Sequence, residues 1–126
     1  DFKGTLNFEN NVFVNNNFFE TGLGNSNEFT SFQNDFSVKY IKNSFHFNIN
    51  TQYFKPDLKQ DISGDLFLDA SIRLTSKNKK IEYMFKANNL LNQKKYRNIN
   101  SSDLSTTSFE HNLQERFALF SIGFRF

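Results

Sequence analysis

The chain has 126 residues, with 18 Phe, four Tyr, no Trp and a formal net charge of +2 from 15 basic and 13 acidic residues. This length suits one domain. The nearly balanced charge argues against a nucleic-acid partner, because such proteins carry a strongly basic surface. The chain has no Cys, which excludes disulfides and thiol chemistry. Its Phe- and Asn-rich, Ala-poor composition disfavours helices and is tolerated in strands and turns.

The sequence contains no candidate for a transmembrane helix. No stretch approaches the roughly 18 consecutive apolar residues that such a helix needs. The start of the chain, Asp1-Phe2-Lys3-Gly4, also lacks the apolar segment of a signal peptide. If the protein is destined for an outer membrane, we therefore expect this chain to be a processed or cut piece of a longer one.

Six segments alternate between apolar and polar residues, and a period of two predicts β-strands with one apolar face. The first three run from about Phe2 to Val14, from Phe32 to Ile41 and from Phe45 to Tyr53. The next two run from Asp65 to Thr75 and from about Ile81 to Asn88. Each has about the 9–11 residues that a tilted strand needs to cross a bilayer.

The sixth segment begins near Gln114 and ends on the last residue, Phe126. Its alternate positions form an apolar face, which consists of Ala118, Phe120, Ile122, Phe124 and Phe126. The termini of soluble domains tend to fray, so the most hydrophobic strand face rarely lies there. We expect this to be the closing strand of an outer-membrane barrel, with Phe120, Ile122, Phe124 and Phe126 facing lipid.

The connections between the segments alternate in length. Two are tight turns, near Lys42-Asn43-Ser44 and at Lys77-Asn78-Lys79-Lys80, and three are long, over about 15–31, 54–64 and 91–113. Short turns at one end and long loops at the other are typical of outer-membrane barrels. Aromatic residues near the strand ends fit the girdles of such barrels; they are Tyr40, Phe45, Tyr53, Tyr83, Phe124 and Phe126. We predict an all-β chain that forms about six strands of an antiparallel transmembrane β-barrel.

A soluble β-sandwich is the main alternative, because its strands show the same alternation. A sandwich would more often have shorter strands and use more Val and Gly, so we favour the barrel. An Asn-rich, aggregation-prone segment of low complexity is a second alternative. The regular alternation and the pattern of connections argue against it.

The segment Lys86-Ala87-Asn88-Asn89-Leu90-Leu91-Asn92-Gln93-Lys94-Lys95-Tyr96 resembles a recurring element of TonB-dependent outer-membrane receptors. In that family the penultimate strand leads into an Asn-Asn-Leu segment, followed by a long external loop and a closing strand that ends in aromatic-x-Phe. The strand that contains Leu66-Phe67-Leu68-Asp69-Ala70 is also similar to the third strand from the end in that family. The resemblance covers about Asp65 to Phe126, and the first half fits by pattern only. Gly123 departs from the family, whose terminal signal has its Gly further upstream.

The resemblance implies a barrel of about 22 strands with a plug in its lumen. It also implies uptake of a scarce nutrient, such as an iron chelate, an oligosaccharide or a peptide, energised through TonB. Residues 1–126 would then be the C-terminal strands, without the plug domain. We expect them in the outer membrane of a Gram-negative bacterium, in contact with lipid, the rest of the barrel and, through a missing N-terminal region, the TonB system. A surface lipoprotein is a further candidate partner.

Two other functions remain open. Six strands cannot close a barrel, because bacterial barrels have at least about eight. Open sheet edges in lipid cost several kcal/mol per unsatisfied group. The missing strands could belong to another chain, in which case the protein is a non-transporting barrel subunit or a component of a secretion complex. The third hypothesis is a soluble β-sandwich interaction domain.

Nothing in the sequence indicates an enzyme, a cofactor or a metal site. His46 and His111 lack other ligand residues at metal-binding spacing, so we expect solvated or lumen-lining roles. Asp57, Asp61 and Asp65 could hold Ca²⁺ in an external loop, but their spacing does not match an EF-hand. We expect a solvated acidic loop there.

The polar strand face would line the barrel lumen, where it would hydrogen-bond to a plug and to water. Its residues include Asp35, Lys39, His46, Asn48, Gln52, Asp69, Arg73, Glu82 and Lys86. We expect substrate contacts to come instead from aromatic residues of the long loops. The candidates are Phe18, Phe19, Phe29, Tyr96 and Phe109.

Overall fold

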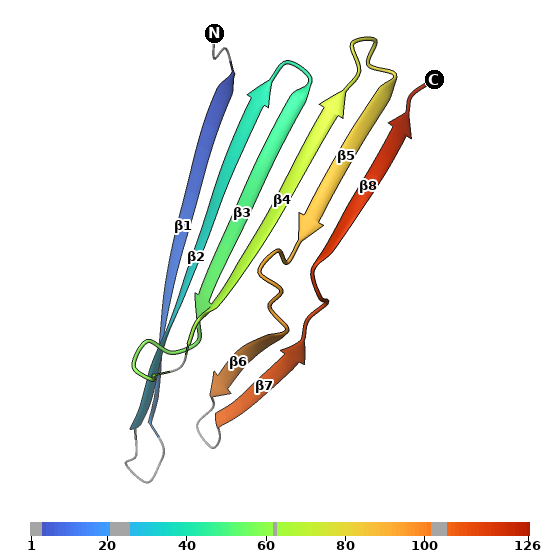
Figure 1. The fold of residues 1–126 in the computed structure, drawn as a ribbon. Coiled ribbons are helices and arrows are strands. Elements are labelled where there is room, and N and C mark those ends of the chain that lie inside the picture. The colour runs from blue at the N-terminus through green and yellow to red at the C-terminus, as the bar shows by residue number, and fades with distance from the viewer. Residues whose placement is uncertain (1–3, 21–25, 62, 102–105) are drawn as a thin grey trace.

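The computed structural model describes residues 4–20, 26–61, 63–101 and 106–126, and all the secondary structure in them is β. Six strands form one antiparallel sheet in the order β1-β2-β3-β4-β5-β8, and β6 and β7 form a separate two-stranded sheet (Figure 1). The strands are β1 (Thr5–Glu20), β2 (Ser26–Lys42), β3 (Phe45–Lys55), β4 (Asp65–Thr75), β5 (Ile81–Asn88), β6 (Lys95–Ser101), β7 (Thr106–Asn112) and β8 (Phe117–Phe124). The described residues include no helix that is long and apolar enough to span a membrane.

The first two strands are longer than the sequence predicts. Their pairing continues without a break from Thr5 opposite Ile41 to Glu20 opposite Ser26. The predicted long loop over 15–31 was therefore mostly wrong, because β1 and β2 extend through much of it as a two-stranded ribbon. Strand pairing joins backbone groups and needs no apolar face, so the Asn-rich stretch after Val14 pairs although its alternation stops.

The predicted loop over 91–113 was also wrong in part, because it contains the hairpin β6–β7. The two strands pair with each other from Lys95 opposite Asn112 to Ser101 opposite Thr106. The last strand begins at Phe117 rather than near Gln114, and Phe126 lies beyond its end. The hairpin is polar and rich in Asn, Ser and Thr, so no apolar alternation marked its strands.

The six-stranded sheet has one apolar and one polar face, which confirms six amphipathic strands. Residues paired across neighbouring strands lie on the same face. One such row is apolar from edge to edge and consists of Leu6, Tyr40, Phe47, Ile72, Phe85 and Phe120. The adjacent row on the other face is polar until its last member and consists of Asn7, Lys39, Asn48, Ser71, Lys86 and Leu119.

The apolar face has a nearly constant length along the strands. It runs from Leu6 to Val14 in β1, and over the same number of residues in three further strands, 32–40, 45–53 and 66–74. Eight steps along a strand amount to about 27 Å. Aromatic pairs mark both limits of this band. The rings of Tyr40 and Phe45 are 6.3 Å apart at the turn end. At the opposite end, those of Phe32 and Tyr53 are 6.1 Å apart.

Glycines accompany both Tyr residues of these pairs. A Cβ at Gly4 would lie 2.5 Å from the Tyr40 ring, and one at Gly64 would clash in the same way with the Tyr53 ring. Only Gly can therefore stand beneath these rings without displacing them. The rings cover the exposed backbone of the glycines, an arrangement that stabilises strand glycines in other sheets.

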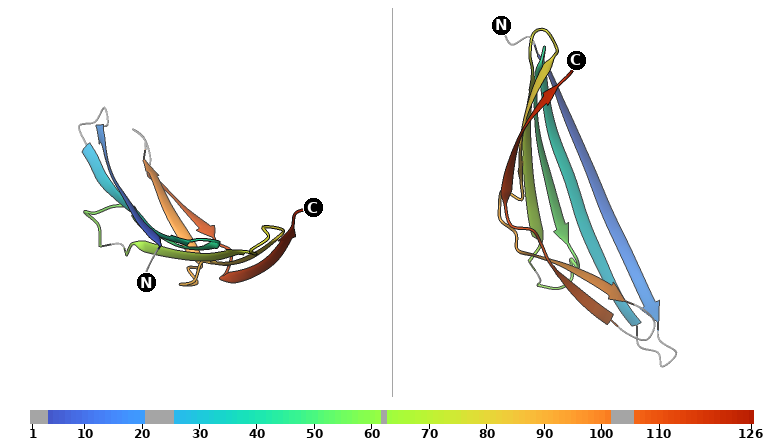
Figure 2. Two further views of the ribbon diagram at one scale, coloured as in Figure 1. Left: turned by 90° about the horizontal axis from the view of Figure 1, so that it is seen from above. Right: turned by 90° about the vertical axis from the view of Figure 1, so that its right-hand side faces the viewer.

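The sheet is a single curved layer and is not closed into a barrel (Figure 2). Among the described residues no second layer covers the apolar face, and Ala87, 7% exposed, is the only fully buried side chain in the hydrophobic core. Phe8 and Phe124 are each 64% exposed. A soluble domain needs a second layer to bury such a face, and the described part of this chain does not supply one.

Candidate functional site

The polar face contains two neighbouring cavities, which share Gln52, Phe67 and Asp69. The hairpin β6–β7 lies on the concave side of the curved sheet (Figure 2). Tyr96, at the base of this hairpin, contacts two residues of the polar face, Phe54 and Phe67. The polar face is therefore the concave one, as expected for residues that line a lumen.

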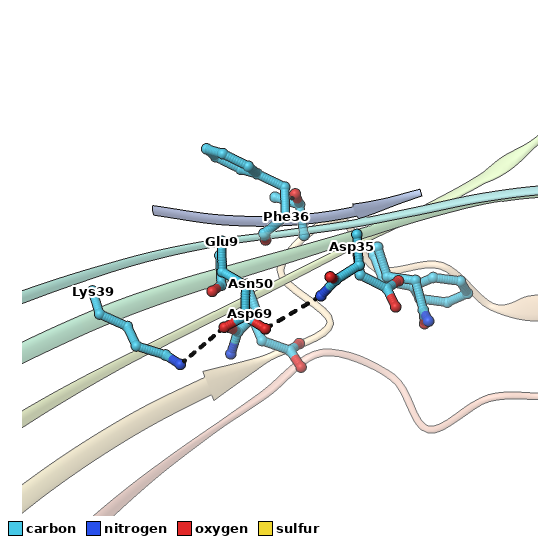
Figure 3. Close-up of a pocket in the computed structure, with 11 residues that line it drawn as sticks. Glu9, Asp35, Phe36, Lys39, Asn50 and Asp69 are labelled. Atoms are coloured by element: carbon cyan, nitrogen blue, oxygen red, sulfur yellow. Dashed lines mark hydrogen bonds and ion pairs between the residues drawn. The ribbon is translucent and has the colours of Figure 1, made fainter. Parts of the chain in front are cut away.

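The first cavity, of about 370 Å³, lies over the middle strands and is lined by side chains of mixed charge. Glu9 accepts a hydrogen bond of 3.2 Å from the Asn11 amide, and its other carboxylate oxygen lies 3.6 Å from Lys39 Nζ (Figure 3). Asp35 accepts from the Gln33 amide at 2.9 Å. Phe36 points to the opposite side of the sheet (Figure 3). Glu9 and Lys39 thus pair with each other, and Asp35 and Asp69 accept from amide groups, which suits a wetted wall more than a reaction centre.

The second cavity, of about 440 Å³, lies where β5 ends and β8 begins. Four aromatic rings line it, those of Phe54, Phe67, Tyr96 and Phe117. The Tyr96 ring is 5.3 Å from Phe54 and 6.2 Å from Phe67, tilted by 43° and 55°. Burial raises the pKa of the Tyr96 hydroxyl above its ordinary value, and the charge of Asp65 raises it further, so the phenol is neutral at physiological pH.

The Asn-rich segment that follows β5 builds the floor of this cavity. Asp69 accepts hydrogen bonds from the backbone N–H of Asn89 at 2.8 Å and from the amide of Asn88 at 3.3 Å. The Asn89 amide donates to the carbonyls of Gln93 and Gln114, and its oxygen accepts from the Gln93 N–H. We call Asn88–Gln93 the Asn junction, because it joins the end of β5 to the chain that leads into β8.

The left-handed backbone conformation explains why asparagines occupy this junction. Asn89 has a φ of 52° and Asn92 has a φ of 54°, a region that Asn tolerates better than most residues. The Asn92 oxygen accepts from the Arg116 N–H just before β8. The Asn junction is thus held by hydrogen bonds, and the side chains of Asn89 and Asn92 bond to backbone groups of the chain.

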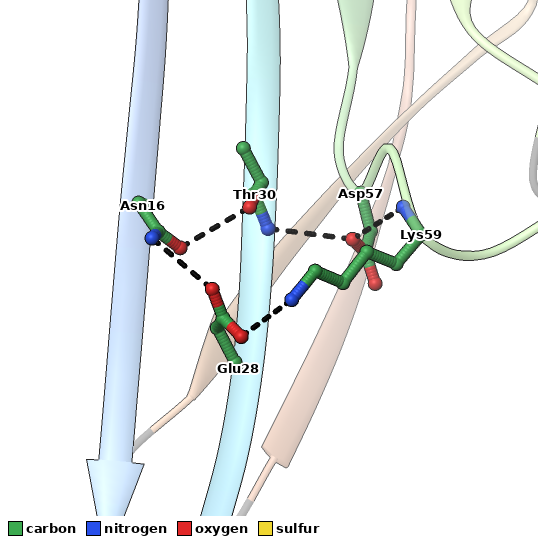
Figure 4. Close-up of polar contacts among 5 residues, drawn as sticks. All are labelled: Asn16, Glu28, Thr30, Asp57 and Lys59. Carbon is green, nitrogen blue, oxygen red and sulfur yellow. Dashed lines mark hydrogen bonds and ion pairs between the residues drawn. The ribbon is translucent and has the colours of Figure 1, made fainter.

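A second polar node lies at the base of the β1–β2 ribbon (Figure 4). Asp57 is 2% exposed, and its carboxylate accepts from the N–H groups of Thr30 at 3.3 Å and Lys59 at 3.0 Å. The expectation that Asp57 is a solvated residue of an acidic loop was therefore wrong. Its carboxylate caps the edge of β2 just beyond the point where β3 stops pairing with it at Phe32.

The same node includes an exposed ion pair. Lys59 Nζ lies 2.5 Å from the Glu28 carboxylate, which also accepts from the Asn16 amide at 3.1 Å (Figure 4). The hydrogen bond from Lys59, followed by that from Asn16, lowers the pKa of Glu28 below its ordinary value. Glu28 is therefore ionised at neutral pH and links the ribbon to the loop after β3.

The turn end of the sheet is basic. A third cavity there, of about 430 Å³, is lined by His46, Lys77, Lys79 and Arg125 together with turn residues. Both predicted tight turns are present, with Asn43 at a φ of 51° and Lys79 at a φ of 57°. Glu82 lies 3.8 Å from Arg73 and 3.7 Å from Arg125, which balances part of this charge.

The residues predicted to face lipid lie where the alternation places them. Phe120, Ile122 and Phe124 belong to the apolar face of β8 and are 61%, 47% and 64% exposed. Phe126 is exposed but lies beyond the strand. Whether lipid covers this face stays a prediction.

The four predicted loop aromatics whose side chains the structure describes do not all lie at one site. Phe18 and Phe29 lie on opposite faces of the β1–β2 ribbon, and Phe109 is exposed in β7. Phe19 is in β1, but its side chain lies outside the described part of the chain. Tyr96 lines the second cavity, where it meets Phe54 and Phe67. The sequence carried a signal for these two, because each is a Phe at a polar-face position.

Among the residues that the structure describes, no group of three or more His, Asp or Glu could hold a metal ion. His46 lines the basic cavity at the turn end, and His111 is exposed in β7. No protein-family model, no curated protein and no solved structure matches the chain.

Proposed function

We propose that this chain forms six adjacent wall strands of a TonB-dependent receptor in the outer membrane of a Gram-negative bacterium. The observation that carries the proposal is the apolar face, which continues across all six strands with aromatic pairs at both limits. In β1 to β4 it is nine residues long, which is within the roughly 9–11 residues that a tilted strand needs to cross a bilayer. Lipid would cover this face where the described chain offers no second layer.

Polar side chains within the apolar band are compatible with lipid around them, because they form hydrogen bonds to other groups of the protein. The Asn34 amide donates to the Asn10 oxygen at 2.7 Å, and both residues lie on the apolar face. The Thr51 hydroxyl donates to the Phe36 carbonyl at 3.3 Å. Without water, an unsatisfied polar group costs several kcal/mol, so such internal pairing favours membrane insertion.

The edges of the sheet require neighbours. β1 and β8 each present one unpaired side to their surroundings in the described structure. In lipid these backbone groups must pair with further strands, and the curvature of the sheet is in the sense that a larger barrel would have (Figure 2). The neighbours would be the remaining wall strands of the receptor.

The receptor class, rather than a barrel of another kind, is supported by the resemblance over Asp65 to Phe126. The function that follows is uptake of a scarce nutrient, energised through TonB. A barrel subunit that is completed by another chain and does not transport is the second candidate, and the two unpaired edges favour it equally.

Spin labels on adjacent residues of β3 test the membrane assignment in the full-length protein. Residues 1–126 contain no Cys, so single substitutions at Ile49, on the apolar face, and Asn50, on the polar face, add the one label site in this part of the protein. A lipid-facing label collides often with O₂ and rarely with a nickel chelate, whereas a lumen-facing label shows the reverse. We expect the first result at Ile49→Cys and the second at Asn50→Cys. A label at Ile49 shielded from both reagents would indicate a sandwich core and contradict the proposal.

Two measurements on the same protein separate a receptor from the second candidate. A photo-crosslinker in place of Glu9, on edge strand β1, should react within one polypeptide in a receptor, and a product with the added mass of another chain would indicate a multi-chain barrel. In planar bilayers a plugged receptor shows no steady conductance. A stable open pore would contradict the receptor proposal while leaving the barrel wall intact.

A further inference from the structure

The second cavity interrupts a polar face with a cluster of aromatic rings. Phe54 and Phe67 occupy polar-face positions, and their neighbours on that face of the same strands, Gln52, Asp65 and Asp69, are polar. Phe117 lies on the same face of β8, next to Leu119. Exposed aromatic residues that converge on one cavity mark a binding site more often than a structural need. On a polar face that is exposed to water, these rings are not buried in a hydrophobic core.

We propose that this cavity, in which Phe54, Phe67, Tyr96 and Phe117 stand among the amides of Gln33, Gln52 and Gln114, binds a neutral oligosaccharide. The proposal rests on the proposed receptor function and names its substrate class. It assigns the aromatic cluster as the surface against which sugar rings stack, and the amides as partners for their hydroxyl groups.

The arrangement of the rings suits a non-planar ligand. Tyr96 is tilted by 43° from Phe54 and by 55° from Phe67, so the rings form a concave corner instead of one flat stack. The C–H faces of linked sugar rings can contact such a corner on two sides. The cavity volume of about 440 Å³ lies within the range of roughly 300–1,000 Å³ that is usual for ligand sites.

The charge of the lining decides between ligand classes. Among the residues that the structure describes, no Lys, Arg or His lines this cavity, and Asp69 is the only ionisable lining residue besides Tyr96. An anionic iron chelate would find no counter-charge there, although Arg and Lys usually bind anionic groups. Amides both donate and accept, which matches the hydroxyl groups of a neutral sugar.

A cationic peptide is less well matched, because the available carboxylate is occupied. Asp69 accepts hydrogen bonds from the Asn89 N–H and the Asn88 amide. Asp35 accepts from Gln33 and lies in the first cavity. Asp65, whose charge acts on Tyr96, is not among the residues that line the second cavity. None of these three is an unpaired carboxylate that lines the aromatic cavity, where a peptide amine would need it.

The site joins the wall to the hairpin. Tyr96 is the second residue of β6 and Leu113 follows β7, whereas the other rings belong to wall strands or their ends. A ligand that contacts both parts would hold the hairpin against the wall. Tyr96 can therefore be changed without altering any strand of the six-stranded sheet.

The test uses the purified full-length protein and isothermal titration calorimetry. The neutral probes are maltohexaose, cellohexaose, mannohexaose and xylohexaose, and the charged probes are ferric citrate and trilysine. We expect at least one neutral hexasaccharide to bind. Tyr96→Ala should weaken that binding about tenfold, since a lost aromatic contact is worth about that factor, and Tyr96→Phe should keep it within about twofold.

The matched control is His111→Ala. His111 pairs with Tyr96 in the hairpin but is not among the residues that line the cavity. It should leave sugar binding unchanged. The proposal is overturned if no neutral probe binds, if a charged probe binds instead, or if Tyr96→Ala has no effect on a sugar that does bind. The spin-label result is independent: a lipid-facing Ile49 with no sugar binding rejects only this inference, whereas sugar binding by a protein without lipid contact rejects the receptor.

Discussion

Two structures project from the loop end of the sheet, and they are attached in different ways (Figure 1). The β1–β2 ribbon continues the pairing of two wall strands beyond Phe32, where β3 stops pairing with β2. The β6–β7 hairpin pairs only with itself. The ribbon must therefore move with the wall, whereas the hairpin can change its orientation without breaking a wall hydrogen bond.

Each projection is nevertheless held at its base by an aspartate that accepts from backbone N–H groups. Asp57 binds the N–H of Thr30 beside the ribbon, and Asp69 binds the N–H of Asn89 below the hairpin. Carboxylates that accept from backbone N–H groups form strong, charge-assisted hydrogen bonds. We infer that Asp57 stiffens the β1–β2 ribbon, which extends the wall, and that Asp69 and the Asn junction form the pivot of the separate β6–β7 hairpin.

The largest effect should come from Asn89→Ala in the Asn junction. This change removes three side-chain hydrogen bonds and places Ala at a φ of 52°. At about 1 kcal/mol for each bond, with added backbone strain, we expect a loss of about 3–4 kcal/mol in stability. The check is the unfolding midpoint of the full-length protein, followed by its heat-dependent mobility in gels.

Asn89→Gly is the matched control for this prediction, because Gly accepts the positive φ but lacks the amide. It should be less destabilising than Asn89→Ala, and the difference should equal the backbone strain of Ala at this φ. Equal stability of the two variants would show that strain contributes nothing. Wild-type stability of both would contradict the role of the Asn junction as a pivot.

A smaller and more local effect is expected for Asp57→Ala. The change leaves the N–H groups of Thr30 and Lys59 without their acceptor at a buried position. The cost should be about 1–3 kcal/mol, confined to the ribbon and the adjoining loop. Hydrogen exchange at Thr30 should accelerate, while exchange at Ile49 in the wall should not change. Asp61→Ala, at an exposed position of the same loop, should have no effect.

The wall could be predicted from the sequence because its chemistry repeats every two residues. Phe45, Phe47 and Ile49 are enough to assign the apolar face of β3. The ribbon beyond Val14 and the hairpin could not be predicted, since they are held by backbone pairing between polar segments that show no alternation. Strand pairing of this kind leaves no pattern in the side chains.

The polar nodes and the aromatic cavity depend on contacts between distant parts of the chain. Asp57 acts on the N–H of Thr30, 27 residues earlier, and the spacing of Asp57, Asp61 and Asp65 carries no trace of this partner. Phe54 was expected in a loop and Phe67 was not singled out, although each is a Phe at a polar-face position. Local pattern could mark them as unusual, but their meeting with Tyr96 depends on the position of the hairpin.

Replacing residues 95–112 with a short Gly-Ser linker should have little effect on the wall. The hairpin shares no strand pairing with the six-stranded sheet, and the Asn junction would keep its bonds to Asp69 and Gln114. We expect the free energy of unfolding of the full-length protein, derived from its unfolding midpoint, to change by less than about 1 kcal/mol, as for ordinary surface substitutions. Failure of the protein to assemble would show that the hairpin is part of the wall's folding unit.

The smallest effect is expected for Glu28→Gln, which removes the exposed charge next to Lys59 at the ribbon base. Because the pKa of Glu28 is lower in the folded protein than its ordinary value of 4.5, the ionised carboxylate stabilises the ribbon above that pH. This contribution is lost as the pH falls through the lowered pKa. The measurement is the ratio of hydrogen-exchange rates at Thr30 in the variant and the wild type, in which the intrinsic pH dependence of exchange cancels. The ratio should slightly exceed one at neutral pH and approach one in acid, and a ratio that does not change with pH would show that the ion pair with Lys59 does not stabilise the ribbon.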